Sequence, residues 1–478
     1  MSKKHPEFSE FWSGIGPRFL PFADAASAEL PLLRILRLSL FQVSVGLAVV
    51  LLTGTLNRVM IVELSVPAWL VATMVSLPLI FAPFRALIGF KSDTYKSHLG
   101  VRRIPYIWYG SLLQFGGLAI MPFALLVLSG DVRGGSPLWG NAGAALAFLM
   151  VGAGMHLTQT AGLALATDIA TPSKRPRIVA LLYVMLLLGM TVSAVVLSAL
   201  LEEFSAKRLI EVIQGAAVVT IALNFIALWK QEVRNPKLTA HDREYPTFSE
   251  MWQSFSAGQR TMRLMIAVGL GAAGFSMQEI LLEPYGAQVL GLSVSATTML
   301  TALFAGGTLI GLALASRLLS RNTDPMRVAG YGVLLGIFAF GAIVYSAPIE
   351  STFLFKLGTT LIGAGGGLFV VGTMTKSMAM VRNGNSGIAV GAWSAVYATA
   401  TGLGLAIGGY LKDGVTSLVA SGSLGNAFDQ ISVGYIFVYH VEILLLFCAL
   451  VAIGPLVGRV YSDGEKHNRK FTMTEIPG

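Results

Sequence analysis

The chain has 478 residues, of which 54% are hydrophobic and only 12% are charged, and its mean hydropathy is +0.69. Soluble globular domains carry about 25% charged residues, so this composition excludes that class. The net charge of +9 does not indicate nucleic acid, because the basic residues lie in short segments between apolar blocks. The blocks approach the ~20 residues that a helix needs to cross a bilayer.

The chain opens with a polar stretch that predicts a short amphipathic helix. Phe8, Phe11, Trp12 and Ile15 follow the spacing i, i+3, i+4 and i+7, which places them on one helix face. Such a helix lies in the membrane interface rather than across it. Twelve apolar segments follow and predict twelve spans. They are 36–57, 67–90, 104–129, 141–166, 178–200, 210–229, 262–283, 293–318, 327–346, 352–375, 386–410 and 433–458.

The basic residues are distributed unevenly about these spans. All but seven of the 34 Lys and Arg lie in the two tails, in the loops that follow even-numbered spans, or in the first or last two residues of a span at that side. Because cytoplasmic loops carry an excess of Lys and Arg, this distribution predicts that both termini are cytoplasmic. The exceptions are Arg58, Arg85, Arg133, Lys207, Arg208, Lys356 and Lys412.

The second half of the chain repeats features of the first. Residues 8–12 (FSEFW) recur as 248–252 (FSEMW), and Val45-Gly46-Leu47 matches Val268-Gly269-Leu270. Both matches fall at equivalent places relative to the spans, which indicates a duplication. The predicted parts are an N-terminal amphipathic segment (1–35), a six-helix bundle (36–229), a cytoplasmic linker with an amphipathic helix (230–261), a second six-helix bundle (262–458) and a cytoplasmic tail (459–478).

Two parallel six-helix halves, related by an axis along the membrane normal, resemble the major facilitator superfamily. We therefore expect an all-α integral membrane protein with twelve transmembrane helices in two pseudo-symmetric bundles. The loop after the second span, with Gly89, Asp93, Arg102 and Arg103, resembles the superfamily signature that joins cytoplasmic helix ends and acts as an inter-bundle gate. The separation between its aspartate and arginines is longer here. A loop that is basic only for topology is the alternative.

Four longer strings resemble one family within that superfamily. They are residues 16–24 (GPRFLPFAD), 36–42 (LRLSLFQ), 57–64 (NRVMIVEL) and 278–286 (QEILLEPYG), and they are similar to the bacteriochlorophyll delivery (LhaA/PucC) family. The resemblance implies a non-enzymatic assembly factor that binds bacteriochlorophyll and brings it to newly inserted antenna polypeptides. It favours the core antenna over the peripheral antenna, and it implies a bacterial inner (intracytoplasmic) membrane.

The same resemblance implies a set of partners. These are the α and β polypeptides of the light-harvesting antenna, the reaction-centre core, pigment-synthesis enzymes and membrane lipid, with no nucleic acid. Magnesium is expected only within the pigment, where it takes one axial ligand from outside the ring.

Two histidines within the predicted spans are candidates for that ligand, since a neutral imidazole binds metals readily. His156 lies among small residues that would let a helix or a flat ring approach. A hydrogen-bonded structural imidazole is the alternative there. His440 is expected to ligate a peripheral pigment or to touch an antenna helix, and an interfacial imidazole bonded to water is its alternative.

Two carboxylates, Glu279 and Glu283, are four residues apart and are therefore expected on one face of the seventh span. Ionisable groups at this depth are costly unless they are paired, protonated or coordinating. Asn57, Arg58 and Glu63, at the matching end of the first span, are the expected partners in a gate between the halves. Contact with pigment or substrate and ordinary helix-end charges are the alternatives.

Three functions fit these features: a pigment-delivering assembly factor, a proton- or ion-coupled transporter that uses Glu279 and Glu283, and a ligand-free membrane scaffold. The sequence contains no nucleophile with a base, no dinucleotide fingerprint and no metal-ligand cluster. We therefore do not expect an enzyme.

Overall fold

The computed structural model describes several separate stretches of the chain, and their regular structure is entirely helical. The stretches are residues 31–80, 101, 103–129, 137–170, 175–232, 259–379, 386–421 and 432–458. Within them the expected all-α class is confirmed. The predicted amphipathic segments at 8–22 and 248–256 lie outside the described residues.

The first predicted span is a chain of four helical pieces. These are α2 (Leu32–Leu38), α3 (Leu40–Val49), the π-helix η2 (Val50–Leu56) and α4 (Asn57–Val62). They form one apolar rod, because a π-helix widens the turns without interrupting the chain of helical bonds. The other helices of this half are α5 (Ala68–Ile80), α7 (Ile104–Leu128), α8 (Pro137–Ile169), α9 (Arg175–Leu200) and α10 (Ala206–Leu228).

The seventh predicted span is broken. It consists of α12 (Gln259–Ser276), a 3-10 turn η5 (Met277–Ile280) and α13 (Leu282–Gln288), and the axis bends by 40° before α13. The remaining helices are α14 (Val294–Ser320), α15 (Pro325–Ser346), α16 (Thr352–Ala379), α17 (Ser386–Ala420), α18 (Ser432–Ile453) and the short η7 (Gly454–Leu456).

Most of these helices have the dimensions of membrane spans. Among the described residues, nine are long and apolar enough to cross a bilayer, and the bent pair of the seventh span makes a tenth. Helices α5 and α17 occupy the predicted second and eleventh spans. The described apolar part of α5 is short, and α17 is long but less apolar. The chain is therefore a multi-pass membrane protein, while the count of twelve spans stays a prediction.

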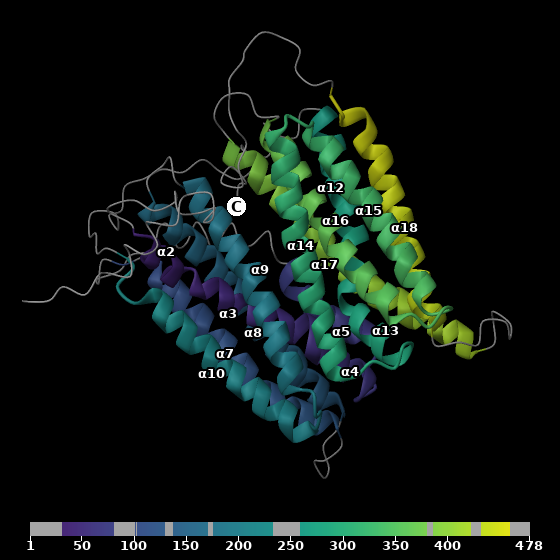
Figure 1. Ribbon diagram of the computed structural model, residues 1–478. Coiled ribbons are helices and arrows are strands. Elements are labelled where there is room, and N and C mark those ends of the chain that lie inside the picture. The colour runs from purple at the N-terminus through teal and green to yellow at the C-terminus, as the bar shows by residue number, and fades with distance from the viewer. Residues whose placement is uncertain are drawn as a thin grey trace, which may run out of the picture.

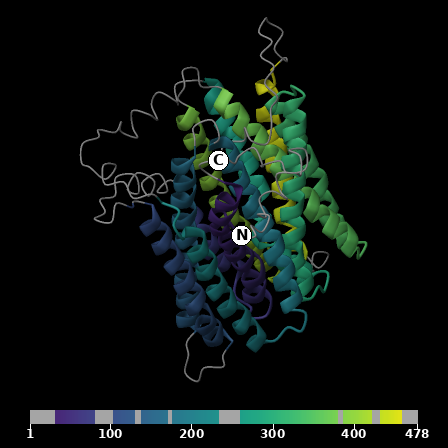
Figure 2. The ribbon, with the colours of Figure 1, turned by 60° about the vertical axis from the view of Figure 1, so that its left-hand side comes forward.

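The helices pack in two groups that meet along several helix pairs. In the first group α7 packs on α8 and α10, and α3 packs on α9; in the second, α16 packs on α14 and α15, and α12 on α17 and α18. Helix α5 meets α17, α9 meets α14, and α4 meets α13 (Figure 1). In Figure 2 the purple first span runs through the middle of the molecule, between the blue-teal and the green-yellow helices.

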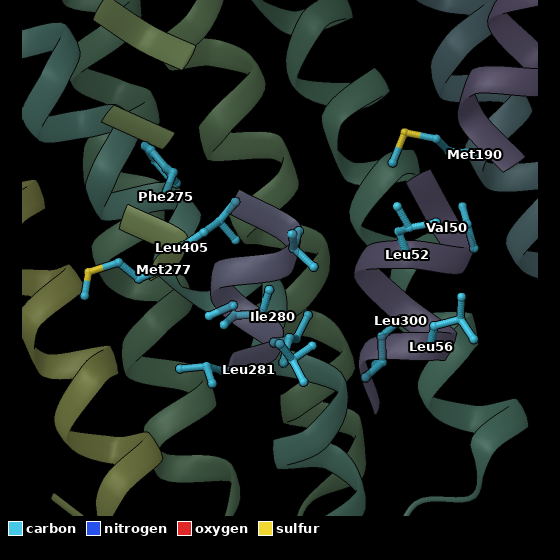
Figure 3. Close-up of a cluster of buried hydrophobic side chains, with 14 of the residues drawn as sticks. Val50, Leu52, Leu56, Met190, Phe275, Met277, Ile280, Leu281, Leu300 and Leu405 are labelled. Atoms are coloured by element: carbon cyan, nitrogen blue, oxygen red, sulfur yellow. The ribbon is translucent and has the colours of Figure 1, made fainter. Parts of the chain in front are cut away.

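One hydrophobic cluster continues from one group into the other. Figure 3 shows Val50, Leu52 and Leu56 of η2 near Leu300 of α14, with the side chains around η5 in the same cluster. Leu56, Leu300 and the η5 residue Ile280 are fully buried. Apolar burial of this kind holds the halves together where the first and seventh spans cross. The remaining residues labelled in Figure 3 are Met190, Phe275, Met277, Leu281 and Leu405.

Candidate functional site

Polar contacts between the halves gather at one end of the molecule, where α5 and α14 begin and α9 and α17 end. In the predicted topology this is the non-cytoplasmic end. We call this set of contacts the seam. Its members are Thr55 Oγ1 with Thr298 Oγ1 (3.2 Å), Asn57 Nδ2 with Ile280 O (2.7 Å), Arg58 Nη2 with Leu292 O (3.4 Å), Trp69 N with Asp413 Oδ2 (2.7 Å) and Ser198 Oγ with Ser295 O (2.9 Å).

Pro284 explains where the seventh span breaks. In a regular helix the residue at 284 would donate its N–H to the carbonyl of Ile280, but proline has no N–H and its ring crowds that carbonyl. Asn57 of the first span supplies the missing donor, since its Nδ2 bonds Ile280 O at 2.7 Å. A side chain of one half therefore completes the backbone of the other, as a break at membrane depth requires.

Glu442 supports the other side of the same break. Its Oε1 accepts the backbone N–H of Gln278 at 2.6 Å, and the residue is fully buried in the middle of α18. Tyr439, one turn earlier, is also fully buried. Glu442 was not among the site residues expected from the sequence. The signal was present, because a carboxylate in the centre of an apolar span is costly and marks a site.

The two carboxylates of the seventh span lie in different environments. Glu283 of α13 is buried, accepts a hydrogen bond from Thr301 Oγ1 at 2.7 Å, and lies against Gly54 of the π-helix. Glu279 of η5 is half-buried, with Tyr397 of α17 close enough to interact electrostatically. The expectation that both share one face of a regular helix is wrong, because the break before Pro284 separates them.

Arg58 and Glu63 form an ion pair within the first half, and Arg58 also reaches Leu292 O across the seam. The guanidinium is buried and attracts the carboxylate of Glu283. Burial raises the pKa of Glu63, although Arg58 acts to lower it. The structure thus brings the predicted residues Asn57, Arg58 and Glu63 to the seam with Glu283.

Arg103 lies at the opposite end of the first half. Its Nε bonds Asp168 Oδ2 of α8 at 3.0 Å. Its backbone N–H and that of Ile104 donate to the carboxylate of Glu232, at 2.9–3.1 Å. Glu232 thereby caps the N-terminus of α7, where a negative charge is favourable. These contacts join α7, α8 and the end of α10. Gly89, Asp93 and Arg102 lie outside the described residues, so the cytoplasmic gate stays a prediction.

The two candidate histidines have different exposure. His156 is half-buried in α8, and close glycine packing surrounds it: a Cβ added at Gly154 would lie 2.7 Å from Gln114 N of α7. The small residues of α8 therefore allow the close approach of α7, which occupies the space beside them. His440 is exposed on α18, and its Nδ1 lies 2.7 Å from Ile436 O.

A magnesium-centred pigment needs one axial donor and an open apolar surface. His440 offers both, because its second ring nitrogen is directed away from its own helix backbone and the imidazole is exposed. Glu283 fits less well in this arrangement, since Gly54 and Thr301 cover it. Among the described residues no group of three or more metal-binding side chains occurs. All four residues, His156, Glu279, Glu283 and His440, stay predictions as pigment contacts.

Comparison with known proteins gives the chain relatives across most of its length. Residues 55–461 match the family model described as PUCC protein. Protein PucC of Rhodovulum sulfidophilum is 57% identical over 407 residues, which cover 84% of this chain and 89% of that protein. An uncharacterized protein from the puhA-bchM intergenic region of Rhodobacter capsulatus is 54% identical and covers 92% of both chains. A bacteriochlorophyll synthase 44.5 kDa chain of Rhodobacter capsulatus is 27% identical over 80% of this chain and 87% of that one.

Solved structures share the fold at low sequence identity. A bacterial homologue of the iron transporter ferroportin, in an inward-facing state, superposes with a TM-score of 0.64 at 17% identity, covering 90% of this chain and all of that one. A bacterial homologue of the lysosomal transporter Spinster, also inward-facing, has a TM-score of 0.63 at 16% identity and covers 88% and 95%. These likenesses confirm the expected transporter-type fold with two helical bundles.

Proposed function

The chain belongs to the PUCC protein family, and from that membership we propose that it is an assembly factor for the purple-bacterial light-harvesting antenna. It binds bacteriochlorophyll in the membrane and delivers it to antenna α and β polypeptides. The observation that carries the proposal is the high identity to protein PucC over most of the chain, together with the strings that resemble the bacteriochlorophyll delivery family. The relative named as a bacteriochlorophyll synthase chain adds support for a link to this pigment.

The proposed role is not enzymatic. Delivery moves an intact pigment and breaks no covalent bond, so it requires a site that binds, orients and releases. When bound, the pigment's magnesium accepts one ligand from the protein. His440 and His156 are the residues of this chain that can hold it there, and Glu279 is the half-buried carboxylate beside the seam. The reaction-centre core and pigment-synthesis enzymes are the further partners we propose.

Complementation in a pigment-making host tests the function. A host that lacks its own copy should assemble little antenna, and the chain should restore the antenna absorption of isolated membranes. The chain purified in mild detergent should carry about one or more bacteriochlorophylls per molecule and retain antenna polypeptides. Normal antenna without the chain, or a purified protein that carries neither pigment nor antenna polypeptides, would overturn the proposal.

We propose the core antenna ahead of the peripheral antenna as the target. Two hosts that each make a single antenna type separate the two. Restoration limited to the core-only host supports this choice, whereas restoration limited to the peripheral-only host overturns it. The location, an inner membrane with cytoplasmic termini, is tested by accessibility labelling at Lys237, which should react only from the cytoplasmic side.

Buried carboxylates at the break favour proton-coupled transport as a second candidate. Glu283 and Glu442 are at most 2% exposed, and each has one oxygen without a hydrogen-bond partner in the part of the chain that the structure describes. A transporter would take up its solute into vesicles in a pH-dependent manner, and Glu283→Gln would abolish that dependence. Antenna restoration by Glu283→Gln at the wild-type level would support delivery without proton coupling.

A further inference from the structure

We propose that the outer face of α18 is a docking site for a magnesium tetrapyrrole, with Nε2 of His440 as the axial ligand. The inference rests on the proposed function and adds the site, the ligand atom and the surface to it. It follows from the orientation of one imidazole, its depth in the span and the side chains around it.

The orientation of the His440 ring leaves one nitrogen available. Nδ1 lies 2.7 Å from the carbonyl of Ile436, one turn earlier on the same helix. A carbonyl only accepts, so Nδ1 carries the proton and Nε2 keeps its lone pair. Metal-binding histidines commonly donate their second ring N–H to a backbone carbonyl in this way, which fixes the tautomer and aims the other nitrogen at the metal.

The depth of His440 makes that lone pair costly without a partner. The residue is the ninth of α18, which begins at Ser432 and continues as an apolar span to Leu456. At about 1.5 Å per residue it lies about 12 Å from the helix start, within a hydrocarbon layer of about 30 Å. Water is scarce at this depth, and polar side chains there tend to be functional. A partner for Nε2 at this depth would come from the membrane phase.

The side chains around the imidazole suit a flat apolar ring. Phe437, Leu444, Phe447 and Val451 are exposed on the same face as His440, with spacings of three and four residues. The one other exposed residue of α18 is Cys448, which contributes a thiol. A face with one metal-binding nitrogen among apolar side chains matches a macrocycle with one central metal. A partner helix of an antenna would need a hydrogen-bond donor aimed at this nitrogen, and such binding is an outcome of the test.

The dependence of pigment binding on magnesium distinguishes axial ligation by His440 from non-specific hydrophobic binding. The purified full chain is titrated with bacteriochlorophyll a and with the same pigment without magnesium, bacteriopheophytin a. The wild type should bind the magnesium pigment about tenfold or more tightly, and His440→Leu should lose that preference. Cys448→Ala, on the same helix, should keep it. Exogenous imidazole should restore the preference in His440→Gly, which keeps the test valid if the leucine variant folds poorly.

A second readout locates the pigment. Cys448 is the only cysteine, it is exposed, and it lies eight residues or about 12 Å along the axis from His440. A fluorophore on Cys448 should be quenched by bound bacteriochlorophyll a in the wild type and should recover in His440→Leu. The matched control carries the fluorophore at Val192→Cys in a Cys448→Ala background, on α9 of the other half (Figure 1), where quenching should be weak.

The outcomes separate the two proposals. A wild type that binds neither pigment overturns pigment delivery, and the inference with it. Pigment binding that is equal with and without magnesium, or unchanged in His440→Leu, overturns the inference alone and leaves delivery standing. Unchanged pigment binding with lost antenna binding in His440→Leu also overturns it, in favour of an antenna contact at this face.

Discussion

In the first span, Val50–Leu56 form a π-helix and the rod continues to Val62, whereas the seventh span turns through η5 and bends by 40°. The match of Val45 with Val268 carries Val50–Leu56 onto residues 273–279, whose last three lie in the 3-10 turn η5, so the departures from α-helical geometry overlap in the two halves. The irregular segment is a π-helix within a continuous helix in the first span, whereas in the seventh span it is a 3-10 turn followed by a bend.

Pro284 accounts for the difference. When the offset of the Val45–Val268 match is extended, the first span has Ile61 at this position, and its backbone N–H allows the helix to continue. The broken span instead depends on side chains from elsewhere, namely Asn57 and Glu442. A continuous helix supplies the hydrogen-bond partners of its own backbone groups. The broken helix instead needs side chains of other helices as partners, and these side chains must stay in place. We therefore expect substitutions of residues that support or pack against the broken span, including Gly54 and Asn57 of the first span, to cost more than substitutions at positions without such contacts.

The largest expected effect comes from Glu442→Ala. The change leaves the N–H of Gln278 without its partner and opens a void beside the break, which should destabilise the protein by about 3 kcal/mol. Glu442→Gln keeps an acceptor oxygen and should cost less than about 1 kcal/mol. Thermal unfolding in detergent measures both. Equal losses in the two variants would contradict a supporting role for this side chain.

Gly54→Ala should come next. The added Cβ would press on Glu283 Oε1 and lie 2.9 Å from Thr301 Oγ1, so the bond between those side chains must shift. A loss of about 1–3 kcal/mol is typical of such overpacking. Gly215→Ala in α10, where nothing lies within 4 Å, should be neutral or stabilising by up to about 1 kcal/mol, because alanine favours helix. Similar unfolding midpoints for both variants would show that the π-helix does not pack tightly against α13.

Asn57→Leu removes the donor to Ile280 O and should cost about 1–2 kcal/mol. Asn57→Asp has nearly the same shape, but an ionised carboxylate has no N–H to donate, so it should lose at least as much stability. Both are measured by unfolding in detergent. An aspartate variant with wild-type stability would show that shape rather than donation matters here.

Pro284→Ala should have the smallest effect alone and sharpens the comparison most. Alanine restores an N–H that can bond Ile280 O, which makes the seventh span more like the first. Asn57→Leu should then cost less in the Pro284→Ala background than in the wild type, by about 1 kcal/mol in a double-mutant cycle. Strict additivity of the two changes would indicate that Asn57 does not replace the missing backbone donor.

The fold lay within reach of the sequence because its signals are local or repeated. Apolar blocks, basic loops and the duplicated strings need no knowledge of distant contacts. At the site, the same reasoning expected Asn57, Arg58 and Glu63 to form a gate between the halves, and the structure places them at the seam. That reasoning expected Arg58 and Glu63 to have partners across the seam, whereas the two residues pair with one another. Across the seam, Arg58 contacts only the backbone carbonyl of Leu292 and interacts electrostatically with Glu283.

Other contacts were out of reach because they join residues far apart in the chain. The bond between Gln278 and Glu442 spans 164 positions, and that between Arg103 and Glu232 spans 129. No local spacing predicts either pair. The break itself had a local signal in Pro284, but the four-residue spacing of Glu279 and Glu283 favoured a regular helix. The span breaks because losing a backbone N–H at Pro284 costs more free energy than an interaction between side chains four residues apart on one helix face contributes.

Asn57 and Ile280 belong to the first and seventh spans, which the repeat relates, so their bond lies near the axis that relates the halves. The contacts of α5 with α17 and of α9 with α14 exchange under the same operation and flank that axis on either side. Were one bundle to tilt against the other about this axis, the flanking contacts would move further than a bond near the axis. The bond between Asn57 and Ile280 is therefore the contact between the halves that such a tilt would disturb least.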